Sequence, residues 1–116
     1  MKLSMAIRIG SMTSQQVRHT IDDGHNGRCA IGAALSAAGI DTTDDNVRFQ
    51  WVEISKRIFP LLSRKVLEDS LLTKIIVEND RNGLPRNQIA DFVELIENEL
   101  EAKEVKQETK ELAEVK

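Results

Sequence analysis

The strongest helical signal in the chain is residues 29–39, which read Cys-Ala-Ile-Gly-Ala-Ala-Leu-Ser-Ala-Ala-Gly. Alanine has the highest helix propensity of all residues, and a glycine such as Gly39 commonly ends a helix in the left-handed conformation. The larger apolar side chains recur every three or four residues, as they do on one face of a helix. Gly32 costs about 1 kcal/mol relative to alanine inside a helix, which indicates that another helix crosses close to it. We therefore expect a central, buried helix over residues 29–38.

Towards both ends of the chain, apolar faces alternate with residues that start or stop helices. A short helix is predicted over residues 3–9, with Ser4 as its cap and Gly10 as its stop. Another helix follows the cluster of aspartate and threonine residues at 41–46. That helix ends at Pro60, because proline lacks a backbone donor and clashes with the preceding turn.

The second half of the chain predicts two more helical regions. Leucine and isoleucine repeat every four residues over 67–76, and Ser70 leaves open whether this region is one helix or two. Residues 79–83 form a stop and a turn. Pro85 then suits the first position of a helix whose apolar face extends over residues 89–100.

Residues 10–28 differ from the rest because they are rich in glycine, serine, threonine, aspartate and asparagine. Apolar residues alternate with other residues before the Asp23-Gly24 turn, a pattern typical of an extended segment. The fold class predicted from the whole pattern is all-α. We expect a compact bundle of four to five short helices with a small extended ribbon near residues 15–28.

The chain length of 116 residues suits one domain. The pattern of charged and apolar residues predicts that the folded domain ends before the last residues of the chain. Residues 1–100 are predicted to form a single helical domain. In residues 101–116 the apolar positions keep no stable face, and Glu104 and Glu108 repel each other at helical spacing. This segment is therefore predicted to be a charged tail, either a frayed helix or disordered.

Composition excludes several functional classes. The chain has 16 Lys plus Arg against 19 Asp plus Glu, a formal charge of −3, and only 3% aromatic residues. Such a balance argues against nucleic-acid binding, which needs a basic surface and often stacking aromatics. No stretch approaches the roughly 20 apolar residues of a membrane helix. A single cysteine permits no internal disulfide, so we expect a cytoplasmic protein. The sequence contains no cofactor-binding motif, and we expect no cofactor.

One cluster of side chains could hold a metal ion: His19, Asp22, Asp23, His25 and Cys29 lie close together in sequence. A transition-metal site needs three or four nitrogen, sulfur or oxygen ligands that converge on one point. Because the spacing from His19 through His25 to Cys29 matches no established zinc motif, these three residues are weak metal candidates. The simpler interpretation is that the histidines are polar loop residues and that Cys29 is buried.

A thiol nucleophile is the second chemical possibility. Cys29 falls at the predicted N-terminus of a helix, where the helix dipole lowers a thiol pKa. Arg28 is adjacent and His25 lies four residues earlier, so a base could be near. Cys29 and His25 are accordingly the catalytic candidates, although a thiol enzyme also needs an oriented base and a cleft.

A helix-turn-helix is the third possibility, since Gly83 and Ile89 have the separation of the turn glycine and a later core residue. The helix that would read DNA carries Asp91, Glu94 and two further glutamates, with only Arg86 at its start. Phosphates repel an acidic helix, so we do not expect DNA binding there.

Three segments together resemble a group of small uncharacterised proteins encoded by bacteria and their phages. The segments are Leu3-Ser4 with Ala6-Ile7-Arg8, Cys29-Ala30-Ile31-Gly32-Ala33, and Asn79-Asp80 followed by Ile89-Ala90-Asp91-Phe92-Val93. The resemblance covers residues 2–97. It implies a phage or mobile-element context and brings no activity or catalytic residue with it.

This chain departs from that group at several positions. Leu84 and Phe92 stand where the group usually has tryptophan, Pro85 where it has Thr or Ser, and a Cys-x-x-Cys pair is missing. The shared polar positions are Asn79 and Asp80, whose side chains suit local capping of a helix end and turn.

We therefore expect a non-enzymatic binding or regulatory protein, encoded by a phage, that acts by protein–protein interaction on a partner of unknown identity. Two alternatives stay open. One is a small thiol- or metal-dependent enzyme centred on Cys29, and the other is an oligomeric module that binds a small ligand between subunits.

Overall fold

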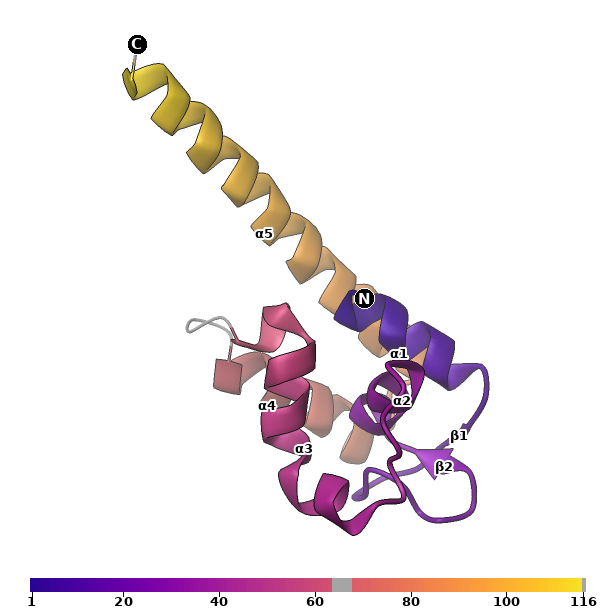
Figure 1. The fold of residues 1–116 in the computed structure, drawn as a ribbon. Helices are drawn as coiled ribbons and strands as arrows, with labels where there is room; N and C mark the ends of the chain where they lie inside the picture. The colour runs from indigo at the N-terminus through magenta and orange to yellow at the C-terminus, as the bar shows by residue number, and fades with distance from the viewer. Residues whose placement is uncertain (64–67, 116) are drawn as a thin grey trace.

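A computed structural model describes residues 1–63 and 68–115 of the chain and confirms the predicted bundle of helices with a small ribbon (Figure 1). In chain order the elements are α1 (Leu3–Ser11), β1 (Gln15–Gln16), β2 (Gly27–Arg28), α2 (Ala30–Ala37), α3 (Asp45–Ile58), the 3-10 turn η1 (Pro60–Ser63), α4 (Glu68–Asp80) and α5 (Arg86–Val115).

Helix α2 lies at the centre, as its alanine-rich sequence predicts, and all its residues from Ala30 to Leu35 are buried. Helix α1 crosses it so closely that a β-carbon on Gly10 would overlap the carbonyl oxygen of Ala33. The prediction that Gly10 stops the first helix is therefore wrong, because α1 continues to Ser11 and Gly10 is needed for the crossing. Gly32 also has a close neighbour, but that neighbour is the carbonyl of Ile21 in the preceding loop rather than a helix.

The predicted caps are correct at α3 and wrong at α1. The Asp44 side chain accepts a hydrogen bond from the Asn46 backbone N–H at 2.8 Å, and α3 ends just before Pro60. Ser4 does not cap α1 but lies inside it, buried against α5. Its backbone N–H and its hydroxyl both donate to the carboxylate of Glu97, so it joins α1 to α5.

Helix α4 is one helix that runs through Ser70, which settles the question that the sequence left open. The chain then turns at Gly83, whose φ is +60°. Pro85 immediately precedes α5, and its carbonyl accepts the Ile89 N–H at 3.0 Å. The C-terminal part of α5 extends away from the other helices (Figure 1). The predicted domain edge at residue 100 stays a prediction, and position 67 of the predicted repeat lies outside the described residues.

The ribbon lies where the sequence predicts it. Strands β1 and β2 pair in parallel, and an antiparallel bridge between Asp22 and Arg28 closes the intervening turn. Gly24 and Asn26 have φ values of +77° and +65° in that turn. Glycine and asparagine tolerate this region of φ best, so the turn residues suit the local backbone.

The core joins residues from every helix. Its largest fully buried apolar side chains are Phe59, Leu3, Ile7, Ile31, Leu35, Leu62, Ile75, Ile89 and Val93. None of the helices within the described ranges has an apolar run long enough to cross a lipid bilayer.

Candidate functional site

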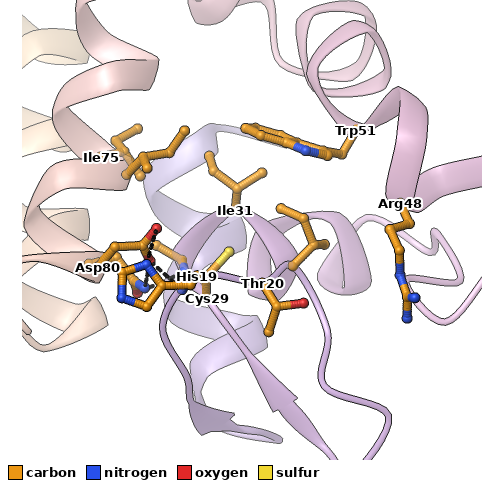
Figure 2. A pocket seen from close by; sticks show the side chains of 12 residues that line it. His19, Thr20, Cys29, Ile31, Arg48, Trp51, Ile75 and Asp80 are labelled. Carbon is orange, nitrogen blue, oxygen red and sulfur yellow. Dashed lines mark hydrogen bonds and ion pairs between the residues drawn. The ribbon is translucent and has the colours of Figure 1, made fainter.

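A pocket of about 310 Å³ opens where the loop before α2, the start of α2, α3 and the end of α4 meet (Figure 2). We call it the Cys29 pocket. Its volume lies at the lower end of the range of about 300–1,000 Å³ that is typical of ligand sites. It is lined by His19, Thr20, Ile21, Cys29, Ala30, Ile31, Arg48, Trp51, Ile75, Ile76, Asn79 and Asp80.

Cys29 lies in this pocket as the N-terminal capping residue of α2. Its Sγ accepts a hydrogen bond from the Gly32 backbone N–H at 3.4 Å. The side chain is buried. Burial raises the pKa of the Cys29 thiol and outweighs the hydrogen bond from Gly32, which acts in the opposite direction. The thiol is therefore protonated at neutral pH and functions here as a helix cap.

Asn79, at the end of α4, holds the walls of the pocket together. Its Oδ1 accepts hydrogen bonds from Gln16 Nε2 at 3.0 Å and from the Ala30 backbone N–H at 3.2 Å. Its Nδ2 donates to the carbonyl of Val17 at 2.9 Å. The side chain is 1% exposed. Asn79 thus connects α4 to the start of α2 and to the loop after β1, contacts that reach much further than the local capping predicted from sequence.

Asp80 and His19 form one edge of the pocket. The carboxylate of Asp80 accepts the His19 backbone N–H at 2.9 Å, and its Oδ2 lies 3.8 Å from Nδ1 of the same histidine. Asp80 also accepts a hydrogen bond from Asn79 Nδ2 at 2.9 Å. His19 has a φ of +66°, a conformation that is uncommon for residues other than glycine, and the contacts with Asp80 hold it there.

The rest of the pocket wall is mostly apolar. Trp51, Ile31 and Ile75 surround its interior (Figure 2). Arg48 lies at the opposite edge from His19 and Asp80, one helical turn before Trp51 on α3 (Figure 2). The pocket therefore has an apolar interior between two polar edges.

His25, the other predicted catalytic candidate, does not line this pocket. It is exposed in the loop between the strands, where its backbone N–H donates to Asp23 Oδ1 at 2.7 Å. The sequence therefore points to His25 beside Cys29, whereas the fold brings His19 to the pocket that Cys29 lines.

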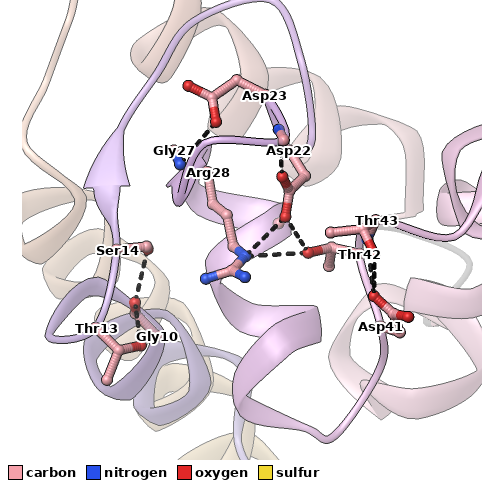
Figure 3. A network of polar contacts seen from close by, with 12 residues as sticks. Gly10, Thr13, Ser14, Asp22, Asp23, Gly27, Arg28, Asp41, Thr42 and Thr43 are labelled. Carbon is pink, nitrogen blue, oxygen red and sulfur yellow. Dashed lines mark hydrogen bonds and ion pairs between the residues drawn. The ribbon is translucent and has the colours of Figure 1, made fainter.

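The two aspartates of the candidate metal cluster accept hydrogen bonds from neighbouring residues of the fold (Figure 3). Asp22 Oδ2 accepts hydrogen bonds from Arg28 Nε at 3.0 Å and from Thr42 Oγ1 at 2.6 Å. Burial alone would raise the pKa of Asp22, but hydrogen bonds from Thr42 and Gly24 and the charge of Arg28 together hold it below its ordinary value. Within the part of the chain that the structure describes, no group of three or more His, Cys, Asp or Glu side chains could hold a metal ion.

Arg86, at the start of the helix considered for DNA binding, is 7% exposed and cannot contact phosphates. Its guanidinium donates to the Ser14 hydroxyl at 2.8 Å and to the Arg28 carbonyl at 3.1 Å, so it joins the segment after α1 to β2. On the outer face of the same helix, Asp91 and Glu94 pair with Arg8 of α1 at 2.8 and 2.6 Å.

A second hollow of about 470 Å³ lies between the start of α1 and α5. Its polar groups are occupied by partners inside the fold, because Glu97 accepts from Ser4 and Glu101 pairs with Lys2 at 2.6 Å. The Cys29 pocket is therefore the better candidate for a functional site.

The sequence alone assigns neither Arg48 nor Trp51 to a site. Trp51 falls on the apolar face of the helix that ends before Pro60, and Arg48 belongs to no motif. Their spacing of three residues is the usable signal, because it places both on neighbouring parts of one helix surface. Comparisons with protein-family models, curated proteins and solved structures give no match for this chain.

Proposed function

We propose that this chain is a non-enzymatic binding protein that regulates a partner protein, and that the Cys29 pocket receives an apolar side chain of that partner. The observation that carries the proposal is the pocket itself, a hollow of about 310 Å³ whose apolar interior lies between two polar edges. Protein interfaces concentrate their binding energy in such places, where an apolar anchor enters a pocket and a polar rim surrounds it.

The rigidity of the pocket supports this role. Asn79 fixes the end of α4 to the start of α2, and Asp80 fixes the position of His19. A pocket that exists before binding costs less free energy to fill than one that must be ordered by its ligand. The side chains that surround the anchor would therefore need little rearrangement.

Panning a random peptide library against the purified protein tests the proposal. We expect enriched peptides to share an apolar anchor residue. Replacing Ile76 by phenylalanine extends a side chain into the pocket, whereas the same change at the adjacent Val77, which does not line it, provides a matched control. Enrichment should be lost with Ile76→Phe and kept with Val77→Phe. Peptides enriched equally by both variants would place the binding surface elsewhere.

One observation favours a second function. Cys29 and the pair of His19 and Asp80 line the same pocket, and a thiol, an imidazole and a carboxylate are the groups of a thiol-dependent enzyme. The raised pKa of Cys29 counts against this alternative, because the thiolate is the nucleophile. Alkylation of Cys29 across a range of pH, described in the Discussion, separates the two functions.

A further inference from the structure

We infer that the Cys29 pocket selects a partner segment in which an acidic residue adjoins the apolar anchor, and that Arg48 binds the acidic side chain. The inference rests on the proposed function and specifies the chemistry of the partner. It follows from a difference between the two edges of the pocket. The charged side chain at one edge is available to a ligand, whereas the charged side chain at the other edge is already hydrogen-bonded.

Arg48 carries a free positive charge. Its side chain is exposed and, among the described residues, forms no ion pair and no side-chain hydrogen bond. The nearest acidic residues along α3 are Asp44 and Asp45, four and three positions earlier. The Asp44 carboxylate accepts the Asn46 N–H that starts the helix, and neither aspartate forms an ion pair with Arg48.

The charge at the opposite edge is already engaged. Asp80 accepts two hydrogen bonds and lies 3.8 Å from the imidazole of His19, and its side chain is only 18% exposed. A ligand therefore meets the available guanidinium of Arg48 at one edge. At the other edge it meets the carboxylate of Asp80, which already accepts hydrogen bonds from His19 and Asn79. This asymmetry favours an anionic group next to Arg48.

The geometry suits a carboxylate from a peptide. Arg48 and Trp51 both line the pocket from α3, three residues apart, with Arg48 at its edge (Figure 2). A residue that adjoins an anchor seated in the pocket would therefore pass the edge that carries Arg48. Guanidinium groups present several donors in a planar fork that matches a carboxylate. An ion pair at an exposed edge typically changes affinity by about two- to fivefold, and salt weakens it.

Matched short peptides provide the probes. We would titrate N-acetyl-Leu-Glu-amide, N-acetyl-Leu-Gln-amide and N-acetyl-Leu-Lys-amide, each also in the reversed order, and follow the fluorescence of Trp51. Trp51 is the one tryptophan of a chain that has no tyrosine, so the signal reports on this pocket. The Glu peptide should bind about two- to fivefold more tightly than the Gln peptide in at least one order, and the Lys peptide most weakly.

Variants of Arg48 assign the preference. Arg48→Gln should abolish the difference between the Glu and Gln peptides, and Arg48→Glu should make the Lys peptide the tightest. Arg57→Gln, at an exposed arginine on the same helix outside the pocket, should leave the preference unchanged. Equal binding of Glu and Gln peptides in both orders, or a preference that survives Arg48→Gln, would overturn the inference while leaving the apolar pocket in place. If none of the six peptides binds, the proposed function fails as well.

Discussion

The side-chain carbonyl of Asn79 accepts a hydrogen bond from the backbone N–H of Ala30 at 3.2 Å, and this contact joins the end of α4 to the start of the central helix. It satisfies one of the amide groups that the first turn of a helix leaves without a partner. Cys29 immediately precedes Ala30, so the same contact fixes the cysteine in the pocket wall.

Replacing Asn79 by alanine should lower the free energy of unfolding by about 2–4 kcal/mol, because buried donors and acceptors lose their partners at about 1–3 kcal/mol each. Urea denaturation measures the change. Asn82 provides a matched control, since it is exposed and its side chain donates a hydrogen bond to Glu78 at 3.1 Å. Asn82→Ala should change stability by no more than about 0.5 kcal/mol. Similar losses in the two variants would mean that Asn79 does not connect the elements as described.

For Gly10→Ala, two physical effects predict changes in stability of opposite sign. Helix propensity alone predicts that alanine stabilises α1 by about 1 kcal/mol. The close approach of Ala33 predicts the opposite, a loss of about 1–3 kcal/mol from overpacking. Thermal denaturation followed by circular dichroism distinguishes the two, and a higher midpoint for the alanine variant would refute the close crossing of α1 over α2.

Asp22 should make the protein sensitive to acid. Its folded pKa lies below its ordinary value, so its contribution to stability is present above the unfolded pKa of about 3.9 and is lost as pH falls through the lower, folded pKa. Asp22→Asn should therefore lower stability at pH 7 and reduce the difference in urea midpoint between pH 7 and pH 3. Asp45→Asn, at an exposed position, serves as the control and should keep the acid sensitivity of the unmodified protein. An unchanged pH dependence in Asp22→Asn would show that this carboxylate is not the responsible group.

Cys29 should react slowly with iodoacetamide at neutral pH, because burial keeps its pKa above that of an ordinary thiol. Labelling should accelerate only when the pH exceeds the ordinary thiol range of about 8–9, or when urea unfolds the chain. Mass spectrometry quantifies the adduct. Rapid labelling of the folded protein at pH 7, lost in a His19→Ala variant, would instead support the thiol-dependent alternative.

The sequence predicts the fold better than it predicts the site. Alanine propensity, the Asp44 cap and Pro60 are local signals, and the structure agrees with each of them. The local patterns at Gly10 and Ser4 mislead, because the roles of these two residues depend on distant partners, Ala33 and Glu97. A local pattern cannot distinguish a glycine that ends a helix from one that allows another helix to approach.

The pocket depends on the same kind of distant contact. The sequence marks Cys29, Asn79 and Asp80 as separate features, and the fold brings them to one pocket. His19 reaches that pocket because Asp80, 61 positions away along the chain, accepts its backbone N–H. Proximity in sequence favoured His25 instead. Only the packing of α4 against α2 decides between the two histidines.

A fluorescence titration of Trp51 tests the central claim, that the Cys29 pocket is the site of partner binding. A peptide obtained by panning would be titrated into the unmodified protein, into Ile76→Phe and into Val77→Phe, with circular dichroism to confirm that each variant is folded. We predict saturable binding to the unmodified protein and to Val77→Phe, and a loss of at least about tenfold in Ile76→Phe, since burying one leucine-sized anchor contributes about 1.5–3 kcal/mol. Equal affinity for all three proteins would contradict the claim.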